Sequence, residues 1–184
     1  MSILGALPTA ALPAGPAYTV VLLCHVAAAL VGMITMVAGI AFSIKLLAAG
    51  SRPVPAPVRS YFSPGTNWAG RALYLVPVLG AVLLGMSGGA YRLTSGWVLA
   101  GAGLWAASIL AAELALWPAE QRVRRALAKA ATEPEGPPPG ATEPAELPEG
   151  ATSAATEAAR LVVAWSVVVV ALLGAAMVVM VVKP

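Results

Sequence analysis

Four long apolar stretches, separated by segments richer in charged residues, proline or glycine, set the pattern of this chain. They are Tyr18–Ile44, Trp68–Met86, Trp97–Trp117 and Leu161–Val182. A helix needs about 20 mostly apolar residues to cross about 30 Å of hydrocarbon. Lipid offers the backbone no hydrogen-bond partner, so a spanning stretch must be helical. The pattern predicts an all-α integral membrane protein, folded as an antiparallel four-helix bundle.

Composition favours a membrane protein over a soluble one. Only 10% of the 184 residues are charged and 59% are hydrophobic, whereas a soluble domain has about 25% charged residues. The basic residues form no long run and are not interleaved with aromatic residues. We therefore expect the lipid bilayer as the surrounding medium and no nucleic acid as a partner. A single cysteine excludes an intramolecular disulfide.

Lysine and arginine are distributed unevenly between the two sides of the four predicted helices. The side reached after the first and third helices holds nine of them, and the other side holds two, Arg92 and Lys183. Because basic residues are retained in the cytoplasm, we expect a plasma-membrane protein with four spans and both termini extracytoplasmic. The nine residues are Lys45, Arg52, Arg59, Arg71, Arg122, Arg124, Arg125, Lys129 and Arg160.

The pattern divides the chain into four parts. Residues 1–17 form an extracytoplasmic segment without the basic start of a cleavable signal peptide. Residues 18–130 hold the first three helices and the cytoplasmic loop between the first two. Residues 131–160 are rich in Pro, Glu and Ala and predict a disordered cytoplasmic linker, which we interpret as a tether rather than an acidic docking segment. Residues 161–184 form the fourth helix and a short outer C-terminus.

The outer half of the predicted bundle contains the candidate ligands. His25 is the only histidine and lies beside Cys24, the only cysteine. Neutral imidazole binds metal ions and haem iron, and thioethers suit Cu(I). The candidate metal ligands are therefore His25, Met86, Met177 and Met180, with His25 as the candidate cofactor-binding residue. We favour the alternative, a packed histidine hydrogen-bonded to a neighbouring helix, and leave the cofactor as haem, copper or none.

Two charged residues of the predicted spans fall at similar depth near the cytoplasmic face. Arg71 opens the second helix from that side, and Glu113 lies about 24 Å along the third helix. We expect Arg71 and Glu113 to form a structural pair within or at the edge of the membrane, or to reach the headgroups separately. A proton relay is less favoured, and His25 lies more than about 10 Å from the depth of Glu113.

Sequence motifs of soluble enzymes are absent. The chain has no Gly-rich phosphate loop, no HExxH motif, no aspartate and one histidine, so acid–base catalysis has few candidate residues. We therefore predict no catalytic residue and no enzyme activity.

The order of the helices and their short motifs resembles a known family. The first helix contains "HVAAA" at 25–29, and the second opens with Arg71 followed by "ALYLVPVLGAVLLGMSGG". The third reads "GWVLAGAGLWAASILAAELALWPAEQRVRRAL", and the chain ends in "AAMVVMVVKP". Together these resemble a bacterial family of predicted integral membrane proteins, domain of unknown function 2269. The likeness covers the four helices and omits the 131–160 segment.

This family looks distantly related to the CopD copper-resistance membrane domain and to the HemJ type of protoporphyrinogen oxidase. The resemblance implies a four-helix membrane protein, with copper or haem handling as a distant implication that maps onto His25. The family continues "HVxAAxx" with Trp-Gly-Gly, whereas this chain has Gly32 in the Trp place and no glycine pair after it.

Three functional hypotheses follow. The favoured one is a non-enzymatic membrane component, an accessory subunit of a larger complex that contacts a membrane-protein partner or a second copy of itself. It rests on apolar faces rich in small residues, such as the pair Ala102 and Ala106. The alternative is a copper- or haem-handling protein that uses His25. A small-solute transporter is least favoured, because so few polar residues leave no polar pathway.

Overall fold

The computed structural model describes residues 15–50, 52–63, 65, 68–132 and 149–182, and every regular element within them is a helix. The all-α class is therefore confirmed. In chain order the elements are α1 (Pro16–Ala49), α2 (Ala56–Tyr61), the 3₁₀ helix η1 (Gly70–Tyr74), α3 (Leu75–Met86), α4 (Gly96–Ala111), the π-helical turn η2 (Ala112–Leu116), α5 (Trp117–Thr132) and α6 (Glu149–Val182).

Within this part of the chain, three helices are long and apolar enough to cross a membrane. They are Pro16–Ala49, Gly96–Thr132 and Ser153–Val182. The second predicted span is shorter than expected, because its helical part is Gly70–Met86 and begins with a 3₁₀ turn. Gly88 and Gly89, both with positive φ, follow it and end the helix. The structure therefore supports a membrane protein by the length and composition of three of its helices.

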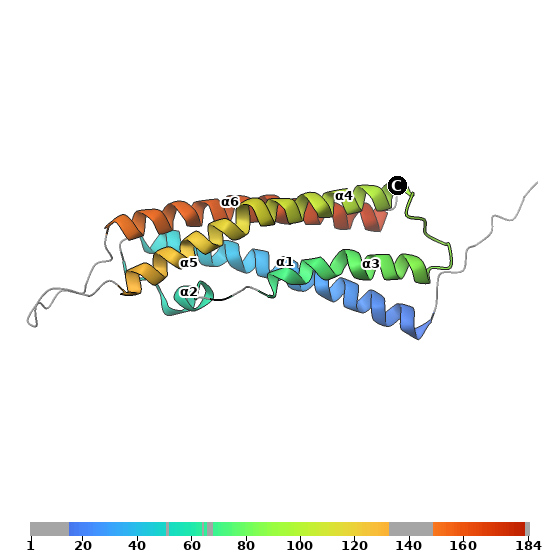
Figure 1. Cartoon of the computed structure of the whole chain (residues 1–184), viewed down its shortest axis with the longest axis horizontal. Helices are drawn as coiled ribbons and strands as arrows, with labels where there is room; N and C mark the ends of the chain where they lie inside the picture. Colours follow the sequence, from blue (N-terminus) through green and yellow to red (C-terminus); the bar gives the residue numbers. More distant parts are fainter. Residues whose placement is uncertain (1–14, 51, 64, 66–67, 133–148, 183–184) are drawn as a thin grey trace, which may run out of the picture.

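The last helix contacts most of the others. α6 packs against α1 on one side and against α4, η2 and α5 on the other, while η1 and α3 pack against α1. Figure 1 shows α2, α5 and the start of α6 at one end of the molecule, and the segment that joins α3 to α4 at the other. We call the first of these the α2 end.

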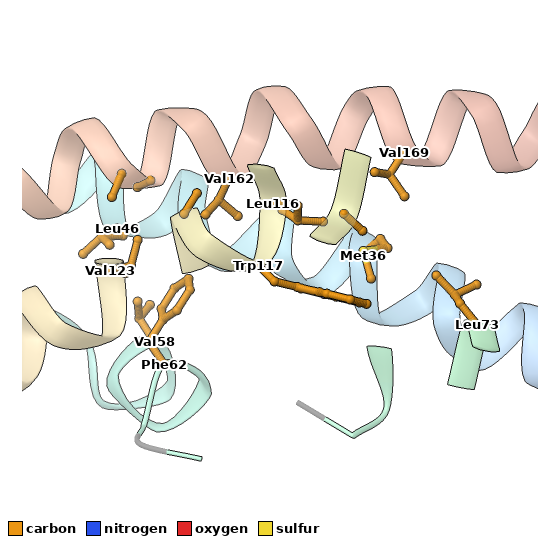
Figure 2. Close-up of a cluster of buried hydrophobic side chains, with 14 of the residues drawn as sticks. Met36, Leu46, Val58, Phe62, Leu73, Leu116, Trp117, Val123, Val162 and Val169 are labelled. Carbon is orange, nitrogen blue, oxygen red and sulfur yellow. The ribbon is translucent and has the colours of Figure 1, made fainter. Parts of the chain in front are cut away.

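The buried apolar core lies towards the α2 end (Figure 2). Between helices in lipid, close packing and van der Waals contact replace the hydrophobic effect that drives packing in water. Large apolar side chains outside this core stay exposed along α1, α3, α4 and α6. The core combines side chains from most of the helices, including Met36, Leu46, Val58, Phe62, Leu73, Leu116, Trp117, Val123, Val162 and Val169.

Two prolines inside helices redirect backbone hydrogen bonds. Pro77 has no N–H to donate to the Leu73 carbonyl four residues earlier, and the indole Nε1–H of Trp105 donates to that carbonyl at 3.1 Å. Before Pro118, the Trp117 N–H bonds to the Ala112 carbonyl, five residues back, in the wide turn η2. This turn lets α4 continue into α5 although a proline ring cannot fit against a regular α-helical turn.

The structure shortens the predicted linker from both sides. α5 continues to Thr132 and α6 begins at Glu149, so residues 149–160 are helical rather than disordered. Alanine is the strongest helix former, and Ala155, Ala158 and Ala159 of this stretch are buried. Residues 133–148, which include the rest of the predicted linker, lie outside the described residues, as do residues 1–14 and 183–184.

Candidate polar site within the helix bundle

His25 lies half-buried on α1 and faces α3. Its Cε1 is 3.4 Å from the position that a Cβ on Gly80 would occupy, and its ring also lies near the backbone carbonyl of Val76. The Nδ1 atom is buried and has no hydrogen-bond partner. The contact of an imidazole with a neighbouring helix agrees with a packed histidine. Cys24, next to it, is exposed.

The predicted methionine ligands lie in different surroundings from His25. Met180 packs against α4, where a Cβ on Gly101 would come 2.7 Å from its Cε, whereas His25 packs against α3. Met86 and Met177 are exposed. In the part of the chain that the structure describes, no group of three His, Cys, Asp or Glu residues could hold a metal ion. The copper or haem hypothesis gains no geometric support from these positions.

Arg71 and Glu113 occupy one region but interact with aromatic residues rather than with each other. The Arg71 guanidinium lies over the rings of Trp117 and Trp68, 5.4 and 5.8 Å from their centroids. Glu113 accepts a hydrogen bond from the Tyr74 hydroxyl. Among the described residues, the ion pair with nitrogen and oxygen within 4 Å is the one between Arg124 and Glu120. The predicted pair is thus replaced by two cation–π contacts and one phenol–carboxylate hydrogen bond.

Among the described residues, the most enclosed charged side chain is Glu120, which the sequence interpretation did not single out. The Glu120 side chain on α5 is only 5% exposed. Carboxylates are rarely buried to this extent in proteins. Its Oε2 lies 3.8 Å from Nη2 of Arg124, one helical turn later.

Polar atoms from three helices converge on Gly39 of α1. A Cβ at Gly39 would lie 3.2 Å from the Tyr61 hydroxyl oxygen, 3.5 Å from Glu120 Oε1 and 3.9 Å from Ser166 Oγ. These groups come from α2, α5 and α6. We call Gly39, Tyr61, Glu120, Arg124 and Ser166 the Gly39 cluster.

Aromatic packing holds Tyr61 in this cluster. Its ring stacks on Phe42 with the centroids 4.6 Å apart and meets Phe62 edge-on at 4.9 Å. Its hydroxyl points to the Thr35 carbonyl at 3.5 Å, a long hydrogen bond. Burial raises the pKa of the Tyr61 hydroxyl, the nearby Glu120 carboxylate raises it further, and Arg124 opposes the rise. Tyr61 therefore presents a neutral hydroxyl at physiological pH.

Arg124 connects the cluster to the chain that follows α2. Its Nη1 donates to the carbonyl of Ser63 at 3.4 Å and to the carbonyl of Gly65. The Arg124 Nε is buried without a partner. One guanidinium thus holds a loop and faces a buried carboxylate.

Two buried hydroxyls nearby have no hydrogen-bond partner. Ser166 is 1% exposed and Ser43, one turn from Gly39 on α1, is fully buried; the Oγ atoms of both are unpaired. Most buried polar groups in proteins are hydrogen-bonded, so these two hydroxyls are exceptions within the described part of the chain.

Part of this cluster could have been found from the sequence. Glu120 and Arg124 have the i, i+4 spacing of a helical ion pair, and Ser43 and Ser166 interrupt apolar stretches. The interpretation ended the third span at Pro118 and so placed Glu120 outside it. The contribution of Tyr61 depends on α2, a six-residue helix with no clear sequence signal.

No protein-family model, no curated protein and no solved structure matches this chain. The resemblance to the family of domain of unknown function 2269 therefore stays a prediction.

Proposed function

We propose that this chain is a four-span plasma-membrane protein, an antiparallel four-helix bundle with both termini extracytoplasmic. In this proposal Gly70–Met86 is the second span, which its apolar composition supports. The α2 end then lies on the cytoplasmic side. The excess of lysine and arginine on that side of the helices supports this orientation.

Within the membrane, we assign it the role of a non-enzymatic component, an accessory subunit that binds other membrane helices. The observation that carries this proposal is an exposed face of small residues on α4: Ala102, Gly103, Ala106 and Ala107. A Cβ on Gly103 would meet nothing within 4 Å. By contrast, Gly32 and Gly39 of α1 are buried within the chain itself. Small faces let helix backbones approach closely in lipid, and among the described residues nothing packs against the Cβ position of Gly103 on the α4 face.

The partner proposal is tested by filling the small face. Gly103→Leu should abolish co-purification of a second membrane protein or a second copy after mild extraction, as measured by native mass spectrometry. Gly174→Leu on α6 is the matched control, because a Cβ there also meets open space. The proposal fails if the wild-type chain is extracted as a bare monomer, or if both variants retain the associated mass.

The topology is tested separately with single cysteines. With Cys24→Ser as background, Ser63→Cys after α2 and Thr94→Cys before α4 report on opposite ends of the molecule. An impermeant maleimide should label Thr94→Cys in intact cells and Ser63→Cys only after the membrane is opened. Labelling of both from the same side would contradict the four-span arrangement.

A further inference from the structure

The Gly39 cluster contains a buried hydroxyl oxygen without a hydrogen-bond partner and a carboxylate only loosely paired with its arginine. Ser166 Oγ is buried and unpaired. Arg124 approaches Oε2 of Glu120 at 3.8 Å, well beyond the roughly 2.7–2.9 Å of a charge-assisted hydrogen bond. The other carboxylate oxygen, Oε1, is the one nearest Gly39.

The glycine at position 39 is what allows these atoms to approach the α1 backbone. A Cβ there would be only 3.2 Å from the Tyr61 hydroxyl and 3.5 Å from Glu120 Oε1. The oxygens of Tyr61, Glu120 and Ser166 thus lie within 4 Å of one point at the α1 surface. They reach it from three different helices, so the packed bundle, and not one segment, sets their arrangement.

The converging atoms of Tyr61, Glu120 and Ser166 are all oxygens, and this restricts the class of ligand that the cluster can bind. Carboxylate and hydroxyl oxygens bind hard cations. Ca²⁺ takes about 6–8 oxygen ligands, more than the cluster offers, and the Arg124 charge beside Glu120 disfavours a second charge on the ligand. A monovalent ion needs neither the additional ligands nor additional negative charge.

We propose that the Gly39 cluster binds a monovalent alkali cation through Glu120 Oε1, the Tyr61 hydroxyl oxygen and Ser166 Oγ. Tyr61 contributes lone pairs as a neutral hydroxyl while its proton is directed to the Thr35 carbonyl. Arg124, anchored on the loop carbonyls, holds the second carboxylate oxygen. This site is separate from the small face on α4 and does not depend on the accessory role.

Thermal unfolding of the full chain in detergent, in NaCl, KCl, LiCl or choline chloride at equal ionic strength, tests the proposal. An alkali cation should raise the unfolding temperature above that in choline, by roughly 2–4 °C at about five times its dissociation constant. Glu120→Gln and Ser166→Ala should lose this difference. Ser43→Ala removes an equally buried hydroxyl outside the cluster, and Glu113→Gln removes an exposed carboxylate; both should keep it.

Line broadening in ²³Na nuclear magnetic resonance provides a direct measure of binding. It should be present in the wild type and lost in Ser166→Ala and in Gly39→Ala, whose methyl group would occupy the convergence point. If Glu120→Gln does not fold, these two variants decide the question. Equal unfolding temperatures of the wild type in all four salts, or sodium broadening that persists in Ser166→Ala, would overturn the proposal.

Discussion

The indole of Trp105 donates to the Leu73 carbonyl oxygen at 3.1 Å, the carbonyl to which Pro77 has no N–H to offer. α4 therefore supplies a hydrogen-bond donor in place of the backbone N–H that Pro77 lacks. Because an unpaired buried carbonyl is costly, Pro77 in one helix and Trp105 in another become interdependent.

Trp105→Phe should lower the free energy of unfolding by about 1–3 kcal/mol, since the Leu73 carbonyl loses its donor. In a Pro77→Ala background the same change should cost less, because the restored backbone N–H can bond to that carbonyl. A double-mutant cycle of unfolding in mixed detergent measures the difference. Additive effects of the two changes would contradict this relationship.

The two glycines Gly32 and Gly101 should respond differently to a methyl group. A Cβ on Gly32 would overlap the branched end of Leu73, a buried residue. Gly32→Ala should therefore destabilise by about 1–3 kcal/mol, as overpacking does. At Gly101 the neighbour is the flexible end of Met180, so Gly101→Ala should cost less than about 1 kcal/mol. Comparable unfolding midpoints for the two variants would show that α1 and η1 can separate freely.

Arg124 should matter more than its neighbour Arg122. Arg124→Gln leaves the Glu120 carboxylate without the guanidinium beside it and removes the charged donor to the carbonyls of Ser63 and Gly65. We therefore expect the free energy of unfolding to fall by about 1–3 kcal/mol. Arg122 is exposed, and Arg122→Gln should change stability by less than about 0.5 kcal/mol. The free energies of unfolding of both variants, and protease cleavage after Ser63, provide the measurement. Equal effects would mean that Arg124 does not hold the loop.

Tyr61 should make stability fall at high pH. Its pKa in the folded protein is raised above the ordinary value of 10.0 by burial and by Glu120, against the opposing effect of Arg124. The unfolded chain then loses the phenolic proton first. The contribution of Tyr61 is complete below about pH 10 and declines above it, at no more than about 1.4 kcal/mol per pH unit. The free energies of unfolding of wild type and Tyr61→Phe should therefore diverge between about pH 9 and 11. Parallel pH profiles would exclude this contribution of Tyr61.

The length and polarity of the apolar stretches were sufficient to predict the helical class. The length of an apolar stretch determines whether a helix can cross the hydrocarbon. Three of the observed helices are long and apolar enough to do so. The boundaries were less predictable. α1 extends from Pro16 to Ala49, beyond the predicted Tyr18–Ile44, because a helix continues past its apolar part wherever propensity and packing allow.

The candidate site was harder to predict, for two physical reasons. The sequence interpretation ended the third span at Pro118, but the helix continues through the wide turn η2, and packing against α1 encloses Glu120. The meeting of Tyr61, Glu120 and Ser166 at Gly39 depends on tertiary packing between segments distant in sequence. His25, which the composition made conspicuous, packs against Gly80.

The contacts of α6 with the other long helices have a consequence for biosynthesis. α6 follows α1, α4 and α5 in the chain, so a ribosome produces it after them, yet α6 packs against all three and contributes Ser166 to the Gly39 cluster. α1, α4 and α5 must therefore stay loosely associated until α6 has been synthesised. The native arrangement is completed only when α6 packs, and the interval before α6 arrives is when chaperones and membrane proteases have access to the unfinished protein.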